Sequence, residues 1–465
     1  MQQNNAFHLV RWITDNREQG RIVWLFNIGA EKYWNPVQAG IIDRSEDRIV
    51  NRIEDMNLLL CRKQDVLIMR AYPDADFLTQ LQQWGMEIPN IEVPAGAAQD
   101  PYTPIAELVL QDSVLLDKLA GYAASETDTY FVPYAVTRIE EEIADKCGLT
   151  IPHANAAVCA EINDKVANRL LAEQLNLPVC KGKVCRSVEE IQQAYDELVH
   201  QPPHFDKVII KDPFGASGKG LYIVEDETRL KPLLARLGRT ARNRPDIQWL
   251  VEGWYKKEAD INFQVYISPD GEADVFSIKN QVLRDTVYIG SQMPPDFEHS
   301  TIEVLQSYGK QIGTKLYEQG YSGVAGIDSI ITDENVLVPI IEINGRFTLS
   351  TYISFIAERM GIAKMLTRYF RLQTEQPISY RTMCDALSKN NLLYNDASKS
   401  GVLLYTSGTL PHVRDETSGR CVGRLFALIA APTWEEANHL QQRLEQFVDE
   451  LPNQSYARAD MQTLG

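Results

Sequence analysis

The sequence predicts a fold of mixed α/β and α+β type with three domains. Its 465 residues leave room for about three domains of ordinary size. Hydrophobic residues make up 44% and charged residues 23%, a balance that supports sizeable cores. Apolar runs alternate with helical patterns up to about residue 150, and strand patterns dominate between about 207 and 345. We therefore predict domains at residues 1–155, 156–370 and 371–465.

The N-terminal part carries the pattern of an open, mostly parallel sheet. Residues 21–27 form a short apolar run that ends before Gly29, as a buried strand does where it meets a loop. A second run covers Asp65–Met69. Between them and the next domain, apolar residues recur at helical spacing from Pro73 to Gly85, where the glycine supplies a C-cap.

The remaining elements follow in order along the chain. We expect helices at about Asp164–Leu175, 187–199 and 301–318, and a strand at Lys207–Lys211. The polar stretch at 373–391 is predicted to be a linker or lid. Strands follow near 401–406 and 423–430, and Thr433 opens the last helix with a capping-box pattern.

Charge and composition exclude several classes of protein. The formal charge of −17 repels phosphate backbones, so we expect no nucleic-acid partner. The seven cysteines form no CxxC pair, which disfavours a disulfide framework and a structural zinc site. The first residues lack the pattern of a signal peptide, and no apolar run approaches the roughly 18 residues of a membrane span. We expect a cytoplasmic protein without membrane contact.

A glycine-rich loop is the first candidate site. Gly215, Ser217, Gly218 and Lys219 lie between the apolar runs at 208–211 and 221–224. Glycines let backbone N–H groups approach phosphate oxygens, and the lysine adds positive charge. The spacing is not that of a Walker A loop, and a strand rather than a helix follows. The pattern predicts a hairpin that folds over a nucleotide; the alternative is an ordinary surface hairpin.

A second candidate site combines two carboxylates with an amide. Glu342 and Asn344 alternate onto one face of a strand, and a three-residue loop at Glu334–Val336 would place Asp328 opposite Glu342. Such oxygen ligands suit Mg²⁺ that carries ATP phosphates. Arg346 comes one step further along the same face, where it could clamp a phosphoryl group. The alternative is an exposed edge hairpin, which Pro339 also suits.

An aromatic strand and a lysine complete the candidate residues. Glu252, Trp254 and Tyr255 end an apolar strand that could offer backbone groups to adenine, and Asp260 follows on the next strand. A core strand would show the same pattern. Lys165, at the start of its helix, would by itself be a solvated lysine.

Taken together and in this order, these segments resemble the ATP-grasp superfamily over roughly residues 155–370. Lys165 and Lys211 match the two family lysines that contact ATP phosphates or adenine. The resemblance implies adenine contacts at Val251–Tyr255 and a ribose contact from Asp260, with Glu258 as the competing position. It implies Mg²⁺ ligands at Asp328, Glu342 and Asn344, because Glu-Ile-Asn-Gly-Arg346 resembles the family's Glu-x-Asn-x-Arg form.

The flanking segments narrow the resemblance. Residues 25–31, LFNIGAE, are similar to the pre-ATP-grasp domain of pheganomycin-type peptide ligases, and the segment from Gln281 to Arg284 fits the same subgroup. The resemblance thus implies an ATP-grasp fold with an N-terminal Rossmann-like pre-ATP-grasp domain and a small C-terminal α+β segment. Gly345 departs from the carboxylase type, which often carries Pro or Thr there.

The resemblance also implies a reaction. ATP and Mg²⁺, or Mn²⁺ in its place, would activate a carboxylate as an acyl phosphate, and an amine would then give an amide, ADP and phosphate. Arg346 and Arg284 would stabilise the acyl phosphate, and Lys219 would contact the phosphates. Expected substrates are an amino acid or peptide in specialised metabolism. Alternatives are transfer to the thiol of an acyl carrier protein, a carboxylase or purine-type enzyme, and a non-catalytic nucleotide-binding protein; a homodimer is left open.

Overall fold

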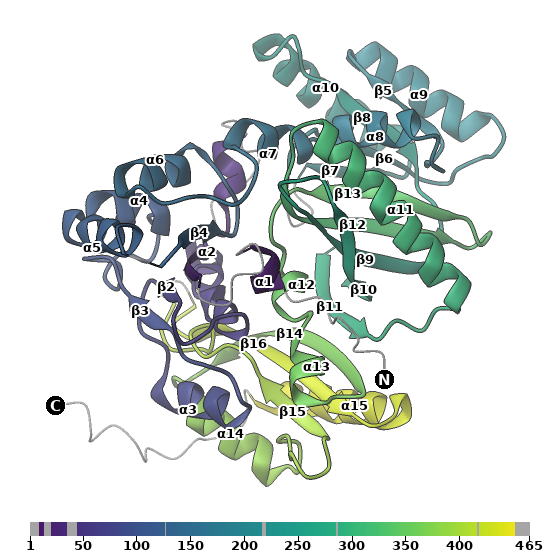
Figure 1. The fold of residues 1–465 in the computed structure, drawn as a ribbon. Coiled ribbons are helices and arrows are strands. Elements are labelled where there is room, and N and C mark those ends of the chain that lie inside the picture. The colour runs from purple at the N-terminus through teal and green to yellow at the C-terminus, as the bar shows by residue number, and fades with distance from the viewer. Residues whose placement is uncertain are drawn as a thin grey trace. The chain divides into compact units, whose positions relative to one another are not determined.

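The computed structural model describes residues 9–13, 20–34, 44–125, 127–215, 220–284, 287–415 and 418–451 (Figure 1). The chain divides into two compact units. The first contains Met1–Ile42, Pro104–Tyr288 and Pro295–Thr351, and the second contains Asp43–Thr103, Ile289–Pro294 and Tyr352–Gly465. The three predicted domain boundaries stay a prediction.

An antiparallel sheet forms the centre of the first unit. Its strands lie in the order β13 (Leu337–Asn344), β12 (Gly323–Thr332), β9 (Lys257–Ile267) and β10 (Ala273–Arg284). Helix α11 (His299–Glu318) lies across one face of this sheet (Figure 1). Alternate residues of β9 pack beneath this helix in a common core, namely Ile261, Phe263, Val265 and Ile267. The residues between them therefore lie on the opposite face of the sheet.

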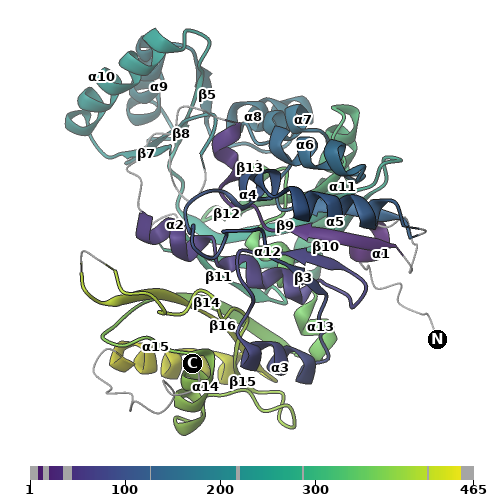
Figure 2. The same cartoon turned by 90° about the vertical axis from the view of Figure 1, so that its left-hand side faces the viewer.

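A second antiparallel sheet carries the glycine-rich segment. Its order is β5 (Gly182–Cys185), β8 (Trp249–Gly253), β6 (Val208–Lys211) and β7 (Leu221–Val224). Figure 2 shows α9 (Val188–His200) and α10 (Glu227–Asn243) next to each other beside this sheet. The apolar residues of both helices share one core with the strands. Two further helices, α7 (Ala156–Ile162) and α8 (Lys165–Gln174), precede this sheet in the chain, and α8 packs on β13 and β8.

The N-terminal portion of the first unit pairs β1 (Arg21–Leu25) in parallel with β4 (Thr129–Pro133). The other elements of this portion are α1 (Leu9–Ile13), a 3-10 turn at Ala30–Tyr33, α4 (Ile105–Gln111), α5 (Ser113–Ala123) and α6 (Arg138–Cys147). Thr137 and Glu140 form a capping box at the start of α6. Helix α12 (Leu349–Tyr352) follows β13 at the end of the unit.

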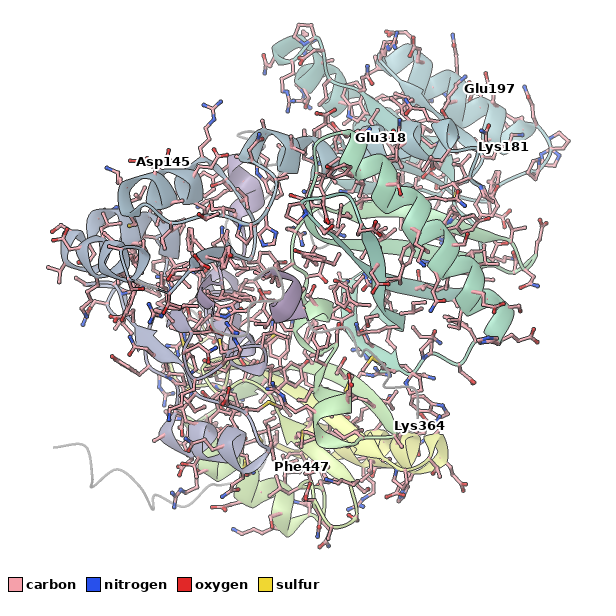
Figure 3. All side chains as sticks on the ribbon, in the orientation of Figure 1. Asp145, Lys181, Glu197, Glu318, Lys364 and Phe447 are labelled. Atoms are coloured by element: carbon pink, nitrogen blue, oxygen red, sulfur yellow. The ribbon has the colours of Figure 1, made fainter. Side chains whose placement is uncertain are left out.

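The second unit contains a parallel strand pair and an antiparallel sheet. The pair is β2 (Val66–Ile68) and β3 (Asn90–Glu92). In the sheet, β14 (Lys364–Thr374) lies between β11 (Val287–Met293) and β16 (Cys421–Ala431), and β15 (Gly401–Leu404) pairs with β16. Helix α15 (Trp434–Glu450) packs on β14 and β16, and its buried residues include Phe447, which Figure 3 labels. The other helices are α2 (Arg44–Val50), a 3-10 helix at Ile53–Leu59, α3 (Ala75–Gln83), α13 (Ile356–Met360) and α14 (Tyr380–Lys389).

Most of the expected elements are confirmed, but the predicted linker or lid at 373–391 is wrong. Strand β14 continues to Thr374, and α14 begins after Ser379, whose hydroxyl accepts from the N–H of Thr382 at 3.1 Å. Met383 and Leu387 are buried at a spacing of one turn. The segment is therefore an amphipathic helix whose many polar residues belong to its solvent face.

Two further sequence expectations concern the whole fold. All seven cysteines are free thiols, as expected. Among the described residues, no helix is both long enough and apolar enough to cross a membrane.

Helix α11 approaches the central sheet closely at Gly309, and a substitution there tests this contact. A Cβ atom built on Gly309 would lie 2.3 Å from Val275 Cγ2, whereas one on Gly121 of α5 would meet nothing within 4 Å. Gly309→Ala should destabilise the protein by about 1–3 kcal/mol through overpacking. Gly121→Ala should instead stabilise it by up to about 1 kcal/mol through helix propensity. Urea unfolding of both variants checks this, and equal effects would contradict the close approach.

Candidate active site

Lys165 joins three parts of the first unit at the start of α8. Asp164 caps the helix by accepting from the N–H groups of Val166 and Ala167 at 2.7 and 3.1 Å. The ammonium group of Lys165 donates to the carbonyl of Gly215 at 2.8 Å and lies 3.0 Å from Glu342 Oε1. Its side chain is only 3% exposed, so the alternative of a solvated surface lysine is wrong.

The glycine-rich segment is an antiparallel hairpin, as the sequence predicts. Strands β6 and β7 pair from Val208 and Val224 to Lys211 and Leu221. The N–H of Asp212 donates to the carbonyl of Gly220 at 2.8 Å, which closes the base of the loop. Gly220 has φ +77, a conformation that favours glycine. Ser217, Gly218 and Lys219 lie outside the described residues, and their assigned roles stay predictions.

Lys211 belongs to a buried ionic cluster that sequence reasoning did not find. Its ammonium group lies 2.6 Å from Glu252 Oε2, and Arg169 Nη1 lies 2.9 Å from Glu252 Oε1. Arg169 also donates to the carbonyls of Cys180 and Gly182 at 2.8 and 3.2 Å. Burial is the largest single effect and lowers the pKa of Lys211, but the charge and hydrogen bond of Glu252, with the nearby Cys180 and Glu342, together raise the pKa. The available signal was spacing, because Arg169 follows Lys165 by one helical turn.

The structure revises the picture of the aromatic hinge. Glu252 is buried and forms ion pairs with Lys211 and Arg169. The N–H groups of Gly253 and Trp254 already donate to the carbonyls of Lys181 and Lys207, both at 2.9 Å. The Trp254 indole lies by Lys257 Nζ, 5.5 Å from the ring centroid. A bound adenine could therefore not use these two donors.

The N–H of Tyr255 is the main-chain donor of the hinge that an adenine could still use. Within the described residues its N–H has no acceptor, while its hydroxyl accepts from Lys181 N at 3.2 Å and its ring packs on Phe205 at 4.9 Å. On the next strand, Asp260 is ion-paired with Lys257 at 2.6 Å. The hinge is thus built with one free N–H and a fixed aromatic wall.

Strands β12 and β13 bring the two predicted metal carboxylates together. Asp328 pairs directly with Glu342, as predicted. The route differs, because the loop is 333–336 and the register near the loop pairs Ile330 with Val338. A bulge opposite Ser329 adds two residues on β13, and Ser329 Oγ donates to the carbonyl of Pro339 at 2.7 Å. Pro339 has no N–H to lose from the ladder, so it suits the bulge of this edge strand.

Amide side chains fix the orientation of Asp328. Asn262 Nδ2 and Gln281 Nε2 donate to Asp328 Oδ1 at 2.8 and 2.7 Å, and Asn344 Nδ2 lies 3.4 Å from Oδ2. Gln264 Nε2 in turn donates to Asn262 Oδ1 at 2.6 Å. These contacts occupy Oδ1 and leave Oδ2 as the better-placed oxygen for a ligand. The sequence analysis includes Gln281 in the segment that fits the subgroup, but it could not predict the contact of Gln281 with Asp328. That contact depends on the register of two strand pairs, β10 with β9 and β9 with β12.

The electrostatics of the site suit a divalent cation. Burial, followed by the nearby charge of Glu342, raises the pKa of Asp328 to about 7. Two facing carboxylates and an amide oxygen are ligands that Mg²⁺ prefers. Among the residues that the structure describes, no group of three His, Cys, Asp or Glu side chains is placed to hold a metal. A Mg²⁺ ion bound at these residues would take its remaining ligands from phosphate oxygens and water.

The predicted position of Arg346 on the face of β13 is wrong. The strand ends at Asn344, whose carbonyl accepts from Arg346 N at 2.8 Å, so the chain turns away after the predicted metal ligands. The Arg346 guanidinium donates to Tyr134 Oη at 3.0 Å and stacks over that ring at 5.3 Å. It still acts on the site at longer range, because its charge lowers the pKa of Asp328 against the effect of burial.

Arg284 lies apart from these contacts at the exposed end of β10. The two residues after it fall outside the described ranges. A catalytic role for Arg284 therefore stays a prediction.

Comparisons with known proteins agree with this geometry. The chain matches the family models of a pre ATP-grasp domain over residues 54–149, an ATP-grasp domain over 170–351 and a PGM1 C-terminal domain over 382–444. It is 28% identical over 341 residues to [Butirosin acyl-carrier protein]--L-glutamate ligase of Niallia circulans, covering 72% of this chain and 74% of that protein.

Solved structures show the same fold at low sequence identity. The ADP complex of an N5-carboxyaminoimidazole ribonucleotide synthetase aligns with a TM-score of 0.53 and 12% identity over 94% of this chain and 98% of the other. The biotin carboxylase domain of 2-oxoglutarate carboxylase from Hydrogenobacter thermophilus, solved with MgADP, ADP and bicarbonate, gives 0.55 and 14% over 91% and 89%.

The fold and the family matches define an ATP-dependent ligase. The chain carries a pre-ATP-grasp domain at residues 54–149 ahead of an ATP-grasp domain at residues 170–351. The sequence-based resemblance to the ATP-grasp superfamily is confirmed.

Removing the carboxylate of the buried ionic cluster should be costly. Glu252→Gln would leave the buried Lys211 without its paired carboxylate and Arg169 with only Glu173, which lies 2.7 Å from its Nε. We expect a loss of about 3 kcal/mol or more in unfolding free energy. The matched control is Glu197→Gln, because Glu197 pairs with Lys183 at 2.8 Å while both side chains are over 40% exposed. That change should cost less than about 1 kcal/mol. Similar losses in urea unfolding would show that the cluster is not a structural centre.

The stability of the ligand-free protein should depend on pH through Asp328. A carboxyl with a higher pKa in the folded state favours folding at low pH and loses that contribution as the pH rises through the folded value. Relative to Asp328→Asn, wild type should lose stability as the pH rises from the ordinary pKa of 3.8 toward about 7. Urea unfolding in EDTA across this range measures the difference. Parallel profiles for the two proteins would refute the raised pKa.

Proposed function

We propose that this chain is an ATP-dependent, ADP-forming carboxylate ligase that activates an amino acid or peptide as an acyl phosphate and joins it to an amine. The observation that carries the proposal is the position of Lys165. One ammonium group touches the root of the glycine-rich hairpin at Gly215 and the metal carboxylate Glu342. A phosphate chain that bound here would meet the hairpin, the lysine and the metal ligands together.

The nucleotide would lie between the hinge and the hairpin. We assign the phosphates to Lys165, Lys211 and the segment that begins at Gly215. The adenine edge would accept a hydrogen bond from the N–H of Tyr255, the donor that the hinge leaves free. The ribose contact would come from Asp260 or Glu258. Asp260 would have to release Lys257 to make it.

The metal would be held by Asp328, Glu342 and Asn344. Bound Mg²⁺ would neutralise charge on the β- and γ-phosphates; we expect Mn²⁺ to substitute for it. The chain prepares the site by holding Asp328 Oδ1 with Asn262 and Gln281. Lys165 meanwhile keeps Glu342 paired in the ligand-free protein. Nucleotide and metal should then bind together, because phosphate oxygens draw Lys165 away from Glu342.

The proposed reaction has two steps. A substrate carboxylate oxygen attacks the γ-phosphorus, the bond to the β,γ-bridging oxygen breaks, and ADP leaves. An amine then attacks the acyl carbonyl, the carbon–oxygen bond to phosphate breaks, and the nitrogen loses a proton. We assign stabilisation of the acyl phosphate to Arg346 and Arg284, and a phosphate contact to Lys219. The cationic groups suit these roles because the charge develops on phosphoryl oxygens.

A second acceptor is favoured by one observation. The 28% identical relative is named for ligating L-glutamate to an acyl-carrier protein, and the match covers most of both chains. In that case the acyl phosphate would form in the same way, and the thiol of a carrier protein would replace the amine. The two candidates thus share the first step and differ only in the nucleophile.

The first step can be tested without knowing the acceptor. We expect pooled amino acids, ATP, Mg²⁺ and hydroxylamine to give a hydroxamate with release of ADP. Glu342→Gln should reduce this rate at least about a hundredfold, because a metal ligand is lost. The control is Glu334→Gln, which changes an exposed residue at the tip of the same hairpin and should leave the rate unchanged. Release of AMP, or full activity in Glu342→Gln, would refute the proposed chemistry.

A further inference from the structure

Helix α10 carries a concentration of positive charge that the proposed site does not use. The chain has a formal charge of −17, yet residues 230–245 contain five basic residues and no Asp or Glu. The basic residues are Lys231, Arg236, Arg239, Arg242 and Arg244. Local reversal of sign on an acidic protein marks a surface that attracts an anionic partner.

The two ends of α10 differ in how this charge is balanced. Near the N-terminus, Arg229 pairs with Glu225 at 2.9 Å and Lys231 lies 4.0 Å from Glu227. Further along, Arg236, Arg239 and Arg242 are exposed, and no described carboxylate lies within ion-pair distance of them. We call these three residues the arginine ridge.

The fold explains why the ridge faces outward. Leu230 and Leu237 are buried in the core shared with α9 and the β5–β8–β6–β7 sheet. Successive ridge residues are three apart, so they are neighbours on the side of the helix away from that core. In both views α10 lies at the periphery of its sheet, next to α9 (Figures 1 and 2).

One end of the ridge adjoins the glycine-rich hairpin. Arg236 Nη2 donates to Tyr222 Oη at 3.2 Å and stacks over the ring at 5.1 Å. Tyr222 Oη donates to Asp212 Oδ2 at 2.8 Å, at the base of the loop. A partner on the ridge would therefore sit beside the hairpin.

We propose that the arginine ridge docks an acidic surface of a partner protein that brings the acceptor to the active site. The inference that the partner carries the acceptor rests on the second candidate of the proposed function, in which the thiol of a carrier protein replaces the amine. Arginine suits such a surface, because it pairs with carboxylates in a fixed fork geometry and is enriched among residues that dominate interfaces. A nucleic acid is disfavoured by the net charge of the chain. A membrane is disfavoured because the exposed face lacks the large apolar residues of an interfacial helix.

Binding tests the ridge directly. The probes are labelled poly-L-glutamate and a labelled, phosphopantetheinylated acyl carrier protein, followed by fluorescence anisotropy. We compare Arg239→Gln/Arg242→Gln with the control Arg229→Gln/Lys231→Gln, which removes the same charge from the same helix. The ridge variant should bind the acidic probes at least about tenfold more weakly than wild type, and the control within about twofold. Raising NaCl from about 0.02 to 0.3 M should weaken wild-type binding.

The outcomes separate this proposal from the proposed function. Equal binding by both variants, or no binding of either acidic probe to wild type, would overturn the proposal that the arginine ridge is a docking surface. If phosphatidylserine vesicles or duplex DNA bind in a ridge-dependent way and the acidic probes do not bind, the ridge docks a membrane or a nucleic acid, and the proposal of an acidic protein partner is overturned. Hydroxamate formation with ADP release is measured on the same variants and should be unchanged. If the wild-type protein forms no hydroxamate with release of ADP, the ligase proposal is refuted. The binding result for the arginine ridge would not be affected by that outcome.

Discussion

The buried ammonium group of Lys165 is the contact on which the active site depends. It joins the first residue of α8, the root of the glycine-rich hairpin and Glu342, a proposed metal ligand on the edge strand β13. A buried lysine is costly unless its charge is paired and its donors are satisfied. Gly215 and Glu342 meet that requirement in the ligand-free protein. In the proposed function, a phosphate that enters the site would replace Glu342 as the partner of the lysine and release the carboxylate.

The buried charges of the site lie in two groups. Around Glu252, Lys211 and Arg169 share one buried carboxylate, and Arg169 also pairs with the more exposed Glu173 at 2.7 Å. Around Asp328, two carboxylates face each other, and the pKa of Asp328 rises to about 7. In the proposed function, an anionic phosphate chain would bind near the cations of the first group and a divalent cation near the carboxylates of the second.

Each sheet separates packing from chemistry. On β9, alternate residues lie under α11 and fill the core, and the residues between them, Asn262 and Gln264, support Asp328. On the other sheet, the apolar residues bury α9 and α10, and the outer face of α10 is left to present the arginine ridge. The site is thus held by side chains whose backbones are fixed by a packed core on the opposite face.

The sequence by itself determined the local features: the hairpin at 208–224, the hairpin that contains Asp328 and Glu342, and the helix that begins near Lys165. These follow from periodicity and turn chemistry, which act between near neighbours. The exact pairing of Asp328 with Glu342 also needed the bulge opposite Ser329, which the sequence did not predict. Only the tertiary structure decided that Arg169 joins Glu252, that Gln281 reaches Asp328, that Arg346 turns toward Tyr134 and that 380–389 is a helix. Those outcomes depend on contacts between distant segments, on strand register and on which face of an element is buried.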